Sequence, residues 1–298
     1  MNRFEGITKP LMLLTAMLLT AVAAGCGGQD PILGGGGGAG NPGPAGAAPA
    51  LASAATFGTF GGSAGMTNTG IQTQINNGDI GTIATATGSI TGFHDSNGDI
   101  YTETPANIGA VSGRIYTCTT STTGPTSVTV NAASCALATQ ARLDAQAAYQ
   151  ALVAKPGGPD PGAGNLATLT LAPGVYTSAS GSFMIQGGDL TLDAQGNPDA
   201  VWVFQMATTL TVGGPGATAP QSVILTGGAQ AKNVYWQVGS AATINAAGGG
   251  TMVGTIISQA GAAFSTVGNT TIVTLNGRVQ SLGASVTLVD TVINVPAP

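Results

Sequence analysis

A short pattern recurs in the C-terminal part of the chain: a small or polar residue, an apolar residue, threonine and a second apolar residue. It occurs at residues 189–192, 209–212, 241–244 and 285–288. This alternation predicts β-strands that bury one face. The outward positions carry mostly Ser, Thr and Ala, where a soluble sheet usually shows Lys and Glu. The chain is therefore expected to form a stacked β-structure that presents a flat, uncharged surface and holds no pocket.

The low content of charge argues against several classes of function. Charged residues make up 6% of the 298 residues, and the formal net charge is −5. An average soluble protein carries about a quarter of charged residues. Because the sequence has no basic patch, nucleic acid is not an expected partner. The single His and the wide spacing of the cysteines leave no pattern for a metal site, and no cofactor is expected.

The first 25 residues are typical of a bacterial lipoprotein signal peptide. Two basic residues precede an apolar run at 11–22, and small residues lead to Cys26. The sequence Ala-Ala-Gly-Cys resembles a lipobox, in which Cys26 is acylated and becomes the new N-terminus. We therefore expect an exported protein, lipid-anchored at the outer membrane or cell surface. The alternative is an ordinary signal peptide with an incidental cysteine, and hence a secreted protein. No later stretch reaches the ~20 apolar residues that span a bilayer.

Composition divides the remaining chain into a linker and one domain. Residues 26–50, beginning with the lipidated cysteine, are rich in Gly and Pro and predict a flexible tether. Residues 51–298 are expected to fold. Within them, 136–155 is rich in strong helix formers. Its small or apolar residues fall on one stripe at helical spacing, which suits a helix lying close against a sheet. The stripe consists of Leu137, Ala141, Ala145, Ala148 and Leu152.

After this helix the chain reads as a series of short strands. The segment 254–258 recurs as 277–281, 23 residues later. A repeat of this length with two or three strands predicts a β-solenoid, here with uneven coils. With Cys26 lipidated, Cys118 and Cys135 remain as a pair, and an exported protein favours a disulfide between them. It would restrict a 16-residue loop that is a candidate cap for one end of the stack. Two buried free thiols are the alternative.

The residues that could carry chemistry are typical of turns. His94 has no partnered nucleophile for a catalytic triad. Asp95, Asn97 and Asp99 resemble half of a Ca²⁺-binding loop, but the acid that such a loop needs seven residues further on is replaced by Ala106. An Asx turn is the simpler interpretation. The same holds for the acidic residues around 193–199, so no enzyme activity is expected.

Aromatic residues lie in two related strands and have two interpretations. Trp202 and Phe204 occur in one strand, and Tyr235 and Trp236 in the other. Exposed on a strand, such residues could form a platform for sugars. Their adjacency within apolar strands favours a place in the core.

Four longer stretches resemble one known family. They read LAPGVY at 171–176, LDAQGNPDAVWVFQ at 192–205, LTGGAQAKNVYWQVGS at 225–240 and LNGRV at 275–279. In sequence and in order they resemble the secreted ice-binding proteins shared by bacteria, snow moulds and sea-ice microalgae, over roughly residues 51–295. The resemblance implies a mainly β fold: an irregular, discontinuous right-handed parallel β-helix with one long α-helix packed alongside. It also implies adsorption to ice through a flat outer face, which inhibits ice growth and recrystallisation.

The predicted ice-binding face collects the small and hydroxyl-bearing outward positions. They are Thr191, Thr209, Thr211, Ser240, Ala241, Thr243, Ser265, Ser285 and Thr287. Coils repeat every ~4.8 Å, and threonine holds a methyl and a hydroxyl group at a stiff χ1 angle. The expected partner is the ice surface and the expected state is a monomer. Asp189 places a charge at one end of this face, and the alternation breaks after Ser265. The alternatives are an adhesin or matrix or glycan-binding protein on the same scaffold and, less favoured, a polysaccharide-degrading enzyme.

Overall fold

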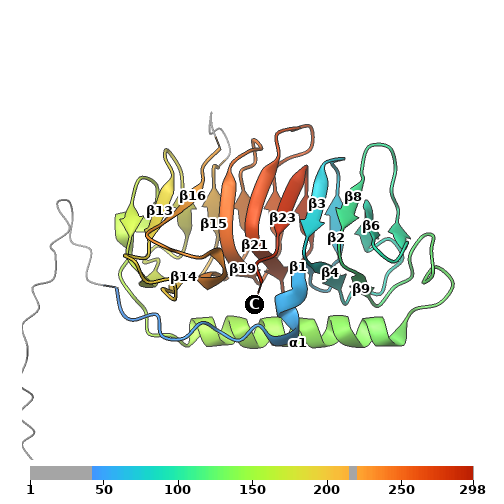
Figure 1. Ribbon diagram of the computed structural model, residues 1–298, viewed down its shortest axis with the longest axis horizontal. Helices are drawn as coiled ribbons and strands as arrows, with labels where there is room; N and C mark the ends of the chain where they lie inside the picture. The colour runs from blue at the N-terminus through green and yellow to red at the C-terminus, as the bar shows by residue number, and fades with distance from the viewer. Residues whose placement is uncertain (1–41, 215–219, 298) are drawn as a thin grey trace, which may run out of the picture. The chain divides into compact units, whose positions relative to one another are not determined.

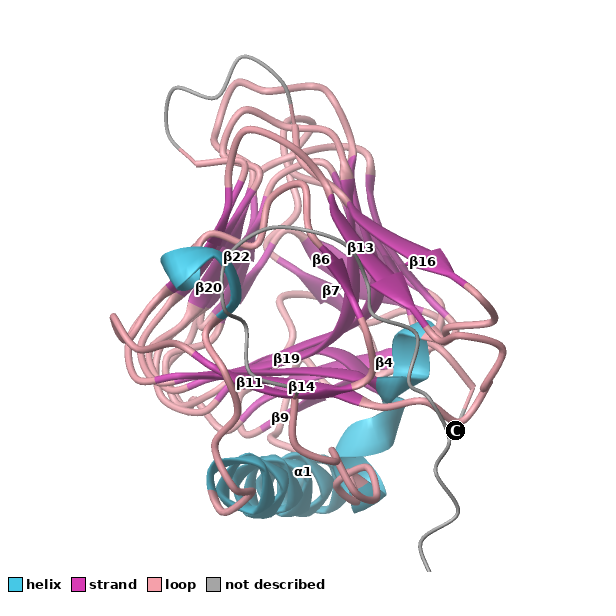
Figure 2. Cartoon of the chain, turned by 90° about the vertical axis from the view of Figure 1, so that its left-hand side faces the viewer, coloured by secondary structure: helices cyan, strands magenta, loops and turns pink. Residues whose placement is uncertain are grey.

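Short parallel strands coil around three sides of a triangular section, which Figure 2 shows in a view along the stack of coils. The computed structural model describes residues 42–214 and 220–297. The predicted signal peptide, Cys26 and residues 27–41 lie outside the described residues. We call the three sides A, B and C. Side A lies against the long helix, and sides B and C meet at the ridge opposite that helix (Figure 2).

Each side is a stack of short strands that pair in parallel. In spatial order, side B contains β12 (Phe183–Ile185), β15 (Leu210–Val212), β18 (Ala242–Ile244), β20 (Ala262–Phe264), β22 (Val286–Leu288), β2 (Met66–Asn68) and β5 (Ile90–Thr91). Side A contains β11 (Gly174–Thr177), β14 (Trp202–Met206), β17 (Val234–Val238), the second halves of β19 (Thr251–Ser258) and β21 (Val273–Ser281), β1 (Phe57–Gly61), β4 (Asp79–Thr82) and β9 (Ile115–Thr117).

Side C is completed by the first halves of β19 and β21. Its other strands are β10 (Thr170–Leu171), β13 (Leu190–Asp193), β16 (Val223–Thr226), β23 (Thr291–Asn294), β3 (Thr73–Asn76), β8 (Gly109–Val111), β6 (Phe93–Asp95) and the antiparallel β7 (Ile100–Tyr101). The structure also has three short 3-10 helices. Helix η1 (Ala52–Thr56) precedes β1, η2 (Pro161–Gly164) lies between α1 and β10, and η3 (Ala231–Asn233) lies between β16 and β17. The predicted mainly β fold with parallel coils is confirmed.

The coils do not stack in chain order. The first coil after η1, residues 57–76, lies beside the last coil, residues 273–295. Strand β1 pairs with β21, β2 with β22 and β3 with β23, so the contact occurs on all three sides. We call this junction the seam (Figure 1, where blue strands lie beside red ones). It makes the β-helix discontinuous, as the resemblance implied.

The repeat seen in the sequence corresponds to neighbouring coils in the structure. Strands β19 and β21 pair in register from Gly254↔Gly277 to Ser258↔Ser281. Both strands bend from side C to side A at these glycines. Gly254 has a φ of +98°, and a Cβ on Gly277 would collide with the carbonyl oxygen of Gly254. Only glycine allows the two backbones to approach so closely at this corner.

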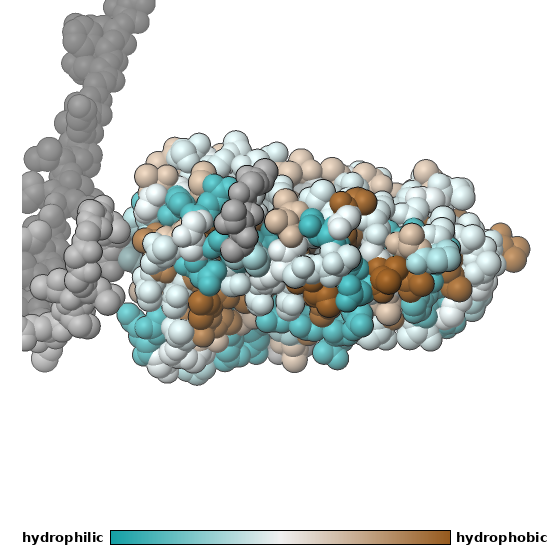
Figure 3. Space-filling view, turned by 90° about the horizontal axis from the view of Figure 1, so that it is seen from above, coloured by the Kyte–Doolittle hydropathy of each residue, from teal (hydrophilic) through white to brown (hydrophobic). Residues whose placement is uncertain are grey.

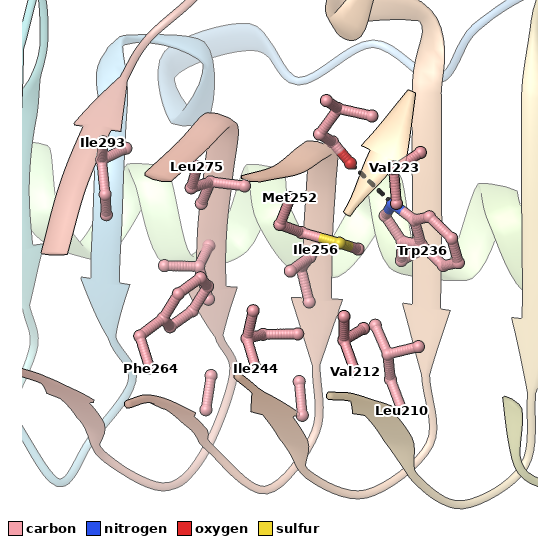
Figure 4. Packing of buried hydrophobic residues seen from close by; sticks show 14 of the residues in the cluster. Leu210, Val212, Val223, Trp236, Ile244, Met252, Ile256, Phe264, Leu275 and Ile293 are labelled. Carbon is pink, nitrogen blue, oxygen red and sulfur yellow. Dashed lines mark hydrogen bonds between the residues drawn. The ribbon is translucent and has the colours of Figure 1, made fainter. Parts of the chain in front are cut away.

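The interior is filled by the inward residues of the three sides (Figure 4). Trp202, Phe204 and Trp236 are fully buried. The rings of Phe204 and Trp236 stack with centroids 4.1 Å apart, and the Trp236 indole Nε1–H donates to the carbonyl of Val253 at 2.9 Å. The prediction that these aromatic residues belong to the core is confirmed. They are therefore not available as a platform for sugars.

Helix α1 (Ala132–Val153) runs along side A. Asn131 caps it, because its side chain accepts from the amides of Ala133 and Ser134. The helix begins four residues before the predicted start. Leu137 was predicted to face the sheet, but it is 48% exposed and the neighbouring Ala138 is buried instead. The buried stripe is Ala138, Ala141, Ala145, Ala148, Tyr149 and Leu152.

Side chains of side A fasten the end of α1 to the strands. The amide of Gln205 donates to the carbonyls of Leu152 and Lys155 at 2.8 and 3.0 Å, and that of Gln237 donates to the Tyr149 hydroxyl at 2.7 Å. Side A is thus a covered face, occupied by the helix.

Among the described residues, no helix is both long and apolar enough to cross a membrane.

The loop between β9 and α1 is closed by a covalent bond. The predicted disulfide joins Cys118 and Cys135, with 4.4 Å between their Cα atoms. The loop lies against β7, the last strand of side C, where Ile100 exchanges backbone hydrogen bonds with Thr122 and Thr123. It therefore occupies the end of the stack, at the position expected for a cap.

Residues 42–50, assigned from composition to the flexible linker, lie on the domain. The backbone of Gly43 forms a bridge with Val175 in β11, and the Lys155 ammonium donates to the carbonyls of Ala45 and Ala47. Ala45 is buried among the residues of α1 and side A. The reason is local: small residues fit into the space beside the helix, and Lys155 binds their carbonyls.

Candidate functional site

Side B carries one row of outward side chains in register. Each three-residue strand buries its first and last residues, so the central residue points outward. In the two-residue β5, Thr91 follows the buried Ile90 and takes the outward position. Backbone pairing aligns these residues across seven strands. In spatial order they are Met184, Thr211, Thr243, Ala263, Thr287, Thr67 and Thr91. We call this row the threonine ladder, because five of its seven members are threonine.

A second row of small residues runs beside the ladder. These residues precede the strands by one position and are linked by backbone hydrogen bonds, as between Leu210 N and Ala241 O at 3.2 Å and between Val286 N and Gly65 O at 3.2 Å. At one end the Ser182 hydroxyl also contacts the hydroxyl of Thr209 at 3.0 Å. The row contains Ser182, Thr209, Ala241, Gly261, Ser285, Gly65 and Ser89. Because none of these side chains is large, side B stays flat.

Within the described strands of side B, no residue of either row is charged. The five ladder threonines also form no side-chain hydrogen bond with the part of the protein that the structure describes. Their hydroxyl groups are therefore left to solvent. Threonine has few χ1 states, and the strands beneath it are held by parallel pairing about 4.8 Å apart. The arrangement offers methyl and hydroxyl groups at fixed, repeated positions.

The structure brings seven of the nine predicted face residues together on side B. They are Thr209, Thr211, Ser240, Ala241, Thr243, Ser285 and Thr287. Thr191 lies elsewhere, in β13 on side C, where it pairs with Thr170 and Ile224. Asp189 is on the same side as Thr191, and its carboxylate accepts from the amide of Ser222. The expected charge therefore does not interrupt side B.

Ser265 stands at the end of side B but does not contribute to its surface. It follows β20 with a φ of +61°, and only 6% of the residue is exposed. Its hydroxyl is buried and has no hydrogen-bond partner within the described residues. The chain turns at this residue toward side C, which explains why the alternation in the sequence ends there.

Sequence reasoning missed the contribution of the N-terminal coils. Thr67 and Thr91 extend the ladder beyond Thr287, because β2 pairs with both β22 and β5. The sequence did contain a pattern that indicates Thr91, because Ser89-Ile90-Thr91 matches Ser285-Val286-Thr287. The pairing partner of β2 could not be read from the sequence, since Thr67 and Thr287 are far apart in the chain.

Side C is a less uniform surface than side B. Its outward positions include Ile224, which is 43% exposed, and the partly exposed His94. His94 pairs with Glu103, with 2.7 Å between the imidazole Nδ1 and the carboxylate. The ridge between sides B and C, onto which Figure 3 looks, shows hydrophobic patches that are separated by polar groups. Ile71 and Val267 are exposed among the described residues of these connections.

The acidic residues considered for Ca²⁺ binding serve the fold. Asp95 accepts from the amides of Asn97 and Asp99, which is the geometry of an Asx turn. Burial opposes ionisation of Asp99, but hydrogen bonds from Thr126, Ser121 and Asn97 outweigh it and lower the pKa of the carboxyl. Within the described ranges, no cluster of three or more His, Cys, Asp or Glu side chains could hold a metal ion.

Comparison with known proteins gives a consistent result. The family model described as ice-binding-like matches residues 60–294. The ice-binding protein of Leucosporidium sp. is 34% identical over 232 residues, which cover 74% of this chain and 76% of that protein. Ice-binding protein 1 of Shewanella frigidimarina is 36% identical over 157 residues, or 50% of this chain but 16% of that protein. The first four curated relatives are matched over 16% to 47% of their length.

Solved structures show the same fold. An ice-binding protein from an Arctic yeast, whose structure was described as a basis for antifreeze activity, superposes with a TM-score of 0.64 and 28% identity. The match covers 84% of this chain and 95% of that one. A domain of the Shewanella protein gives a TM-score of 0.64 at 27% identity, covering 85% and 98%. Because the family model spans most of its length, this chain belongs to the ice-binding-like family.

Proposed function

We propose that the protein adsorbs to ice through side B and thereby inhibits ice growth and recrystallisation. The observation that carries this proposal is the threonine ladder: five threonines, one alanine and one methionine aligned across neighbouring strands, with no charged residue among them or in the row beside them within the described strands. The relatives and solved structures that resemble this chain are themselves described as ice-binding proteins.

The physical argument concerns the water next to side B. Charged groups orient water around themselves, and a surface without them leaves the first layer free to take an ice-like arrangement. Rigid methyl and hydroxyl groups at a regular spacing can hold such a layer. Each contact is weak, so the affinity must come from many contacts on a surface that needs no reordering when it binds. The pairing of seven strands provides that rigidity.

The first experiment measures recrystallisation inhibition and partitioning into ice for the chain from Gly27 onward. The decisive variant is Thr243→Tyr at the middle of the ladder, because a large ring there lifts the flat surface off the ice. The matched control is Thr191→Tyr on side C. We expect Thr243→Tyr to lose most of the activity while Thr191→Tyr keeps it, with the same melting temperature. No ice effect of the unmodified chain at micromolar concentration would refute the proposal.

The same measurements separate the alternatives. An adhesin or matrix protein would bind a surface or glycan without affecting ice. The aromatic residues that could have formed a sugar platform, Trp202, Phe204 and Trp236, are fully buried. Release of reducing sugar from polysaccharides would support an enzyme, and we expect none.

We further propose that Cys26 is acylated and holds the domain at the cell surface. The supporting observation is the sequence Ala-Ala-Gly-Cys at the end of the apolar run. Growth with an alkynyl fatty acid should label the unmodified protein and leave Cys26→Ser unlabelled and released from the membrane fraction. Equal labelling of both proteins would contradict the proposal.

A further inference from the structure

The seam differs from every junction between consecutive coils, because no short connection holds its two edges together. Several side-chain hydrogen bonds cross it, joining residues between 218 and 226 positions apart. They run from Asp290 to Ile71 and Gln72, from Arg278 to Ala55, from Gln280 to Ala54, from Asn76 to Asn294 and from Ser63 to Gly283.

Two of these bonding residues carry a charge although they are buried. Arg278 is 2% exposed and Asp290 is 5% exposed, in a chain in which only 6% of residues are charged. Burial of a charge is unfavourable unless hydrogen bonds compensate for it. Here backbone groups provide them: Arg278 donates to the carbonyls of Ala55 and Pro296, both at 2.7 Å. At the seam, these two buried charges thus join parts of the chain that are distant in sequence.

Asp290 occupies the corner of the last coil between sides B and C. Its Oδ1 accepts from the amides of Ile71 and Gln72, each at 2.9 Å. The residue has a φ of +42°, and a Cβ on Gly70 would collide with its carboxylate. The two amides belong to the turn that follows β2. The carboxylate therefore fixes the turn four residues after Thr67.

Backbone contacts on both sides of this turn transmit the constraint to the ladder. The amide of Thr69 donates to the carbonyl of Leu288 at 3.0 Å. Strand β2 then pairs with β22 so that Thr67 lies opposite Thr287, and β5 places Thr91 opposite Thr67. A slip of the N-terminal coil by one residue would turn these threonines inward. The register of this end of side B consequently depends on the seam.

We infer that Asp290 is a positioning residue of the ice-binding side, holding the N-terminal coil so that Thr67 and Thr91 continue the ladder of the C-terminal coils. This inference rests on the proposed function for the identity of the ligand, whereas the placement of the coil is independent of it. Asp290 itself is buried and does not contact ice.

The same corner in an earlier coil provides a comparison. Asn245 has a φ of +46° and, through its amide, accepts from Gln221 N at 3.1 Å and donates to Gln221 O at 3.0 Å. There a neutral amide joins two coils that follow each other closely in the chain. At the seam an acceptor is needed for two successive amides. Asn could supply one acceptor oxygen in the same place, so Asp290→Asn should retain much of the constraint.

The test combines substitutions of Asp290 with substitutions of the two threonines that it is inferred to position, Thr67 and Thr91. Asp290→Ala and Asp290→Asn are made in the unmodified chain and in a chain that carries Thr67→Ala and Thr91→Ala. The second chain, which we call the blocked chain, lacks the N-terminal threonines but keeps the C-terminal part of the ladder and its activity. In the unmodified chain, Asp290→Ala should lower recrystallisation inhibition several-fold and Asp290→Asn should keep most of it. In the blocked chain, Asp290→Ala should cause no further loss. A residue that acts only on overall stability would reduce activity equally in both. The control is Asp193→Ala, because within the described residues the Asp193 carboxylate accepts a hydrogen bond only from the nearby amide of Gln195.

Hydrogen exchange separates this inference from the proposed function. In Asp290→Ala, amides of residues 66–76 should exchange faster, while those of 242–264 should not change. This readout remains valid if the unmodified chain shows no ice activity, in which case the proposed function fails alone. Should Asp290→Ala not fold, Asp290→Glu displaces the carboxylate by one methylene and is judged by the same measurements. Unchanged exchange at 66–76, full activity of Asp290→Ala, or an equal loss in the blocked chain would overturn the inference.

Discussion

Sides A and B are built from the same coils and differ in what their outward residues meet. On side A, Val175, Val203 and Tyr235 point outward and are buried under α1. On side B, the outward row consists mostly of threonine, and its hydroxyl groups have no partner within the described residues. The inward residues of both sides contribute to a single core.

The difference shows how one solenoid separates folding from binding. Apolar and amide side chains on side A match the small residues of α1, so this side is occupied as soon as the chain folds. Hydroxyl and methyl groups on side B match no other element of the described domain. Stability should therefore respond to substitutions on side A, and ice activity to substitutions on side B. Four predictions test that separation.

The largest effect is expected from charges on side B. Thr243→Lys combined with Thr287→Lys should abolish recrystallisation inhibition, because two ammonium groups orient water against an ice-like layer. Both positions are partly exposed, so the free energy of unfolding should change by no more than about 0.5 kcal/mol. Thr191→Lys with Thr274→Lys on side C is the matched control. If the control loses as much activity as the side B variant, the two sides do not differ as proposed.

Removal of the disulfide should lower stability without changing side B. Cys135 lies in α1 and Cys118 follows β9, so the bond fixes the start of the helix against side A. Cys118→Ala with Cys135→Ala should lower the free energy of unfolding by about 3 kcal/mol, as expected for a loop of this length. Denaturant unfolding measures the change. Ice activity near 0 °C should persist. Its loss in a protein that is still folded would show that ice activity depends on residues outside side B.

Enlarging a buried alanine of α1 should be less severe. Ala148 is 1% exposed and faces side A, so Ala148→Leu overfills the contact and should cost about 1–3 kcal/mol. The neighbouring Ala147 is exposed, and Ala147→Leu should have little effect. Thermal unfolding compares the two variants. Equal melting temperatures would show that α1 is not packed tightly on the sheet.

The smallest effect is a gain on side B. Ala263 interrupts the threonines between Thr243 and Thr287. Ala263→Thr adds a hydroxyl and a methyl group at this position of the ladder, and threonine suits an outward strand position. A modest increase in ice affinity is expected, measured by partitioning into ice. A decrease would indicate that the water layer over side B requires the space that alanine leaves.

Much of the fold could be predicted because its signals are local. The alternation of apolar residues gave the strands, and the spacing of small residues gave the helix that packs on them. The repeat of 254–258 at 277–281 predicted neighbouring coils, which the pairing of β19 and β21 confirms. The pairing of Cys118 with Cys135 followed from a count of cysteines. The prediction for one residue of the buried helix stripe was wrong. Leu137 is exposed and the next residue, Ala138, is buried instead.

The composition of the site was harder to predict because it depends on distant pairing. The pattern around Thr191 is the same as that around Thr211, yet the two strands lie on different sides. Local alternation shows that a residue points outward but not from which side. Thr67 and Thr91 were missed for a related reason, since they join the ladder only through the seam.

The length of α1 sets a limit on the number of coils. Its 22 residues extend about 33 Å at ~1.5 Å per residue. The eight strands of side A span seven intervals, or roughly 34 Å at ~4.8 Å each. The helix thus has the same length as the stack of strands, and it returns the chain from the coil that ends in β9 to the coil that begins with β10. An insertion that adds a coil, and so widens the surface offered to a crystal, must also lengthen the helix by about three residues, close to one turn. Evolution of a broader surface is therefore coupled to growth of an element on another side of the molecule.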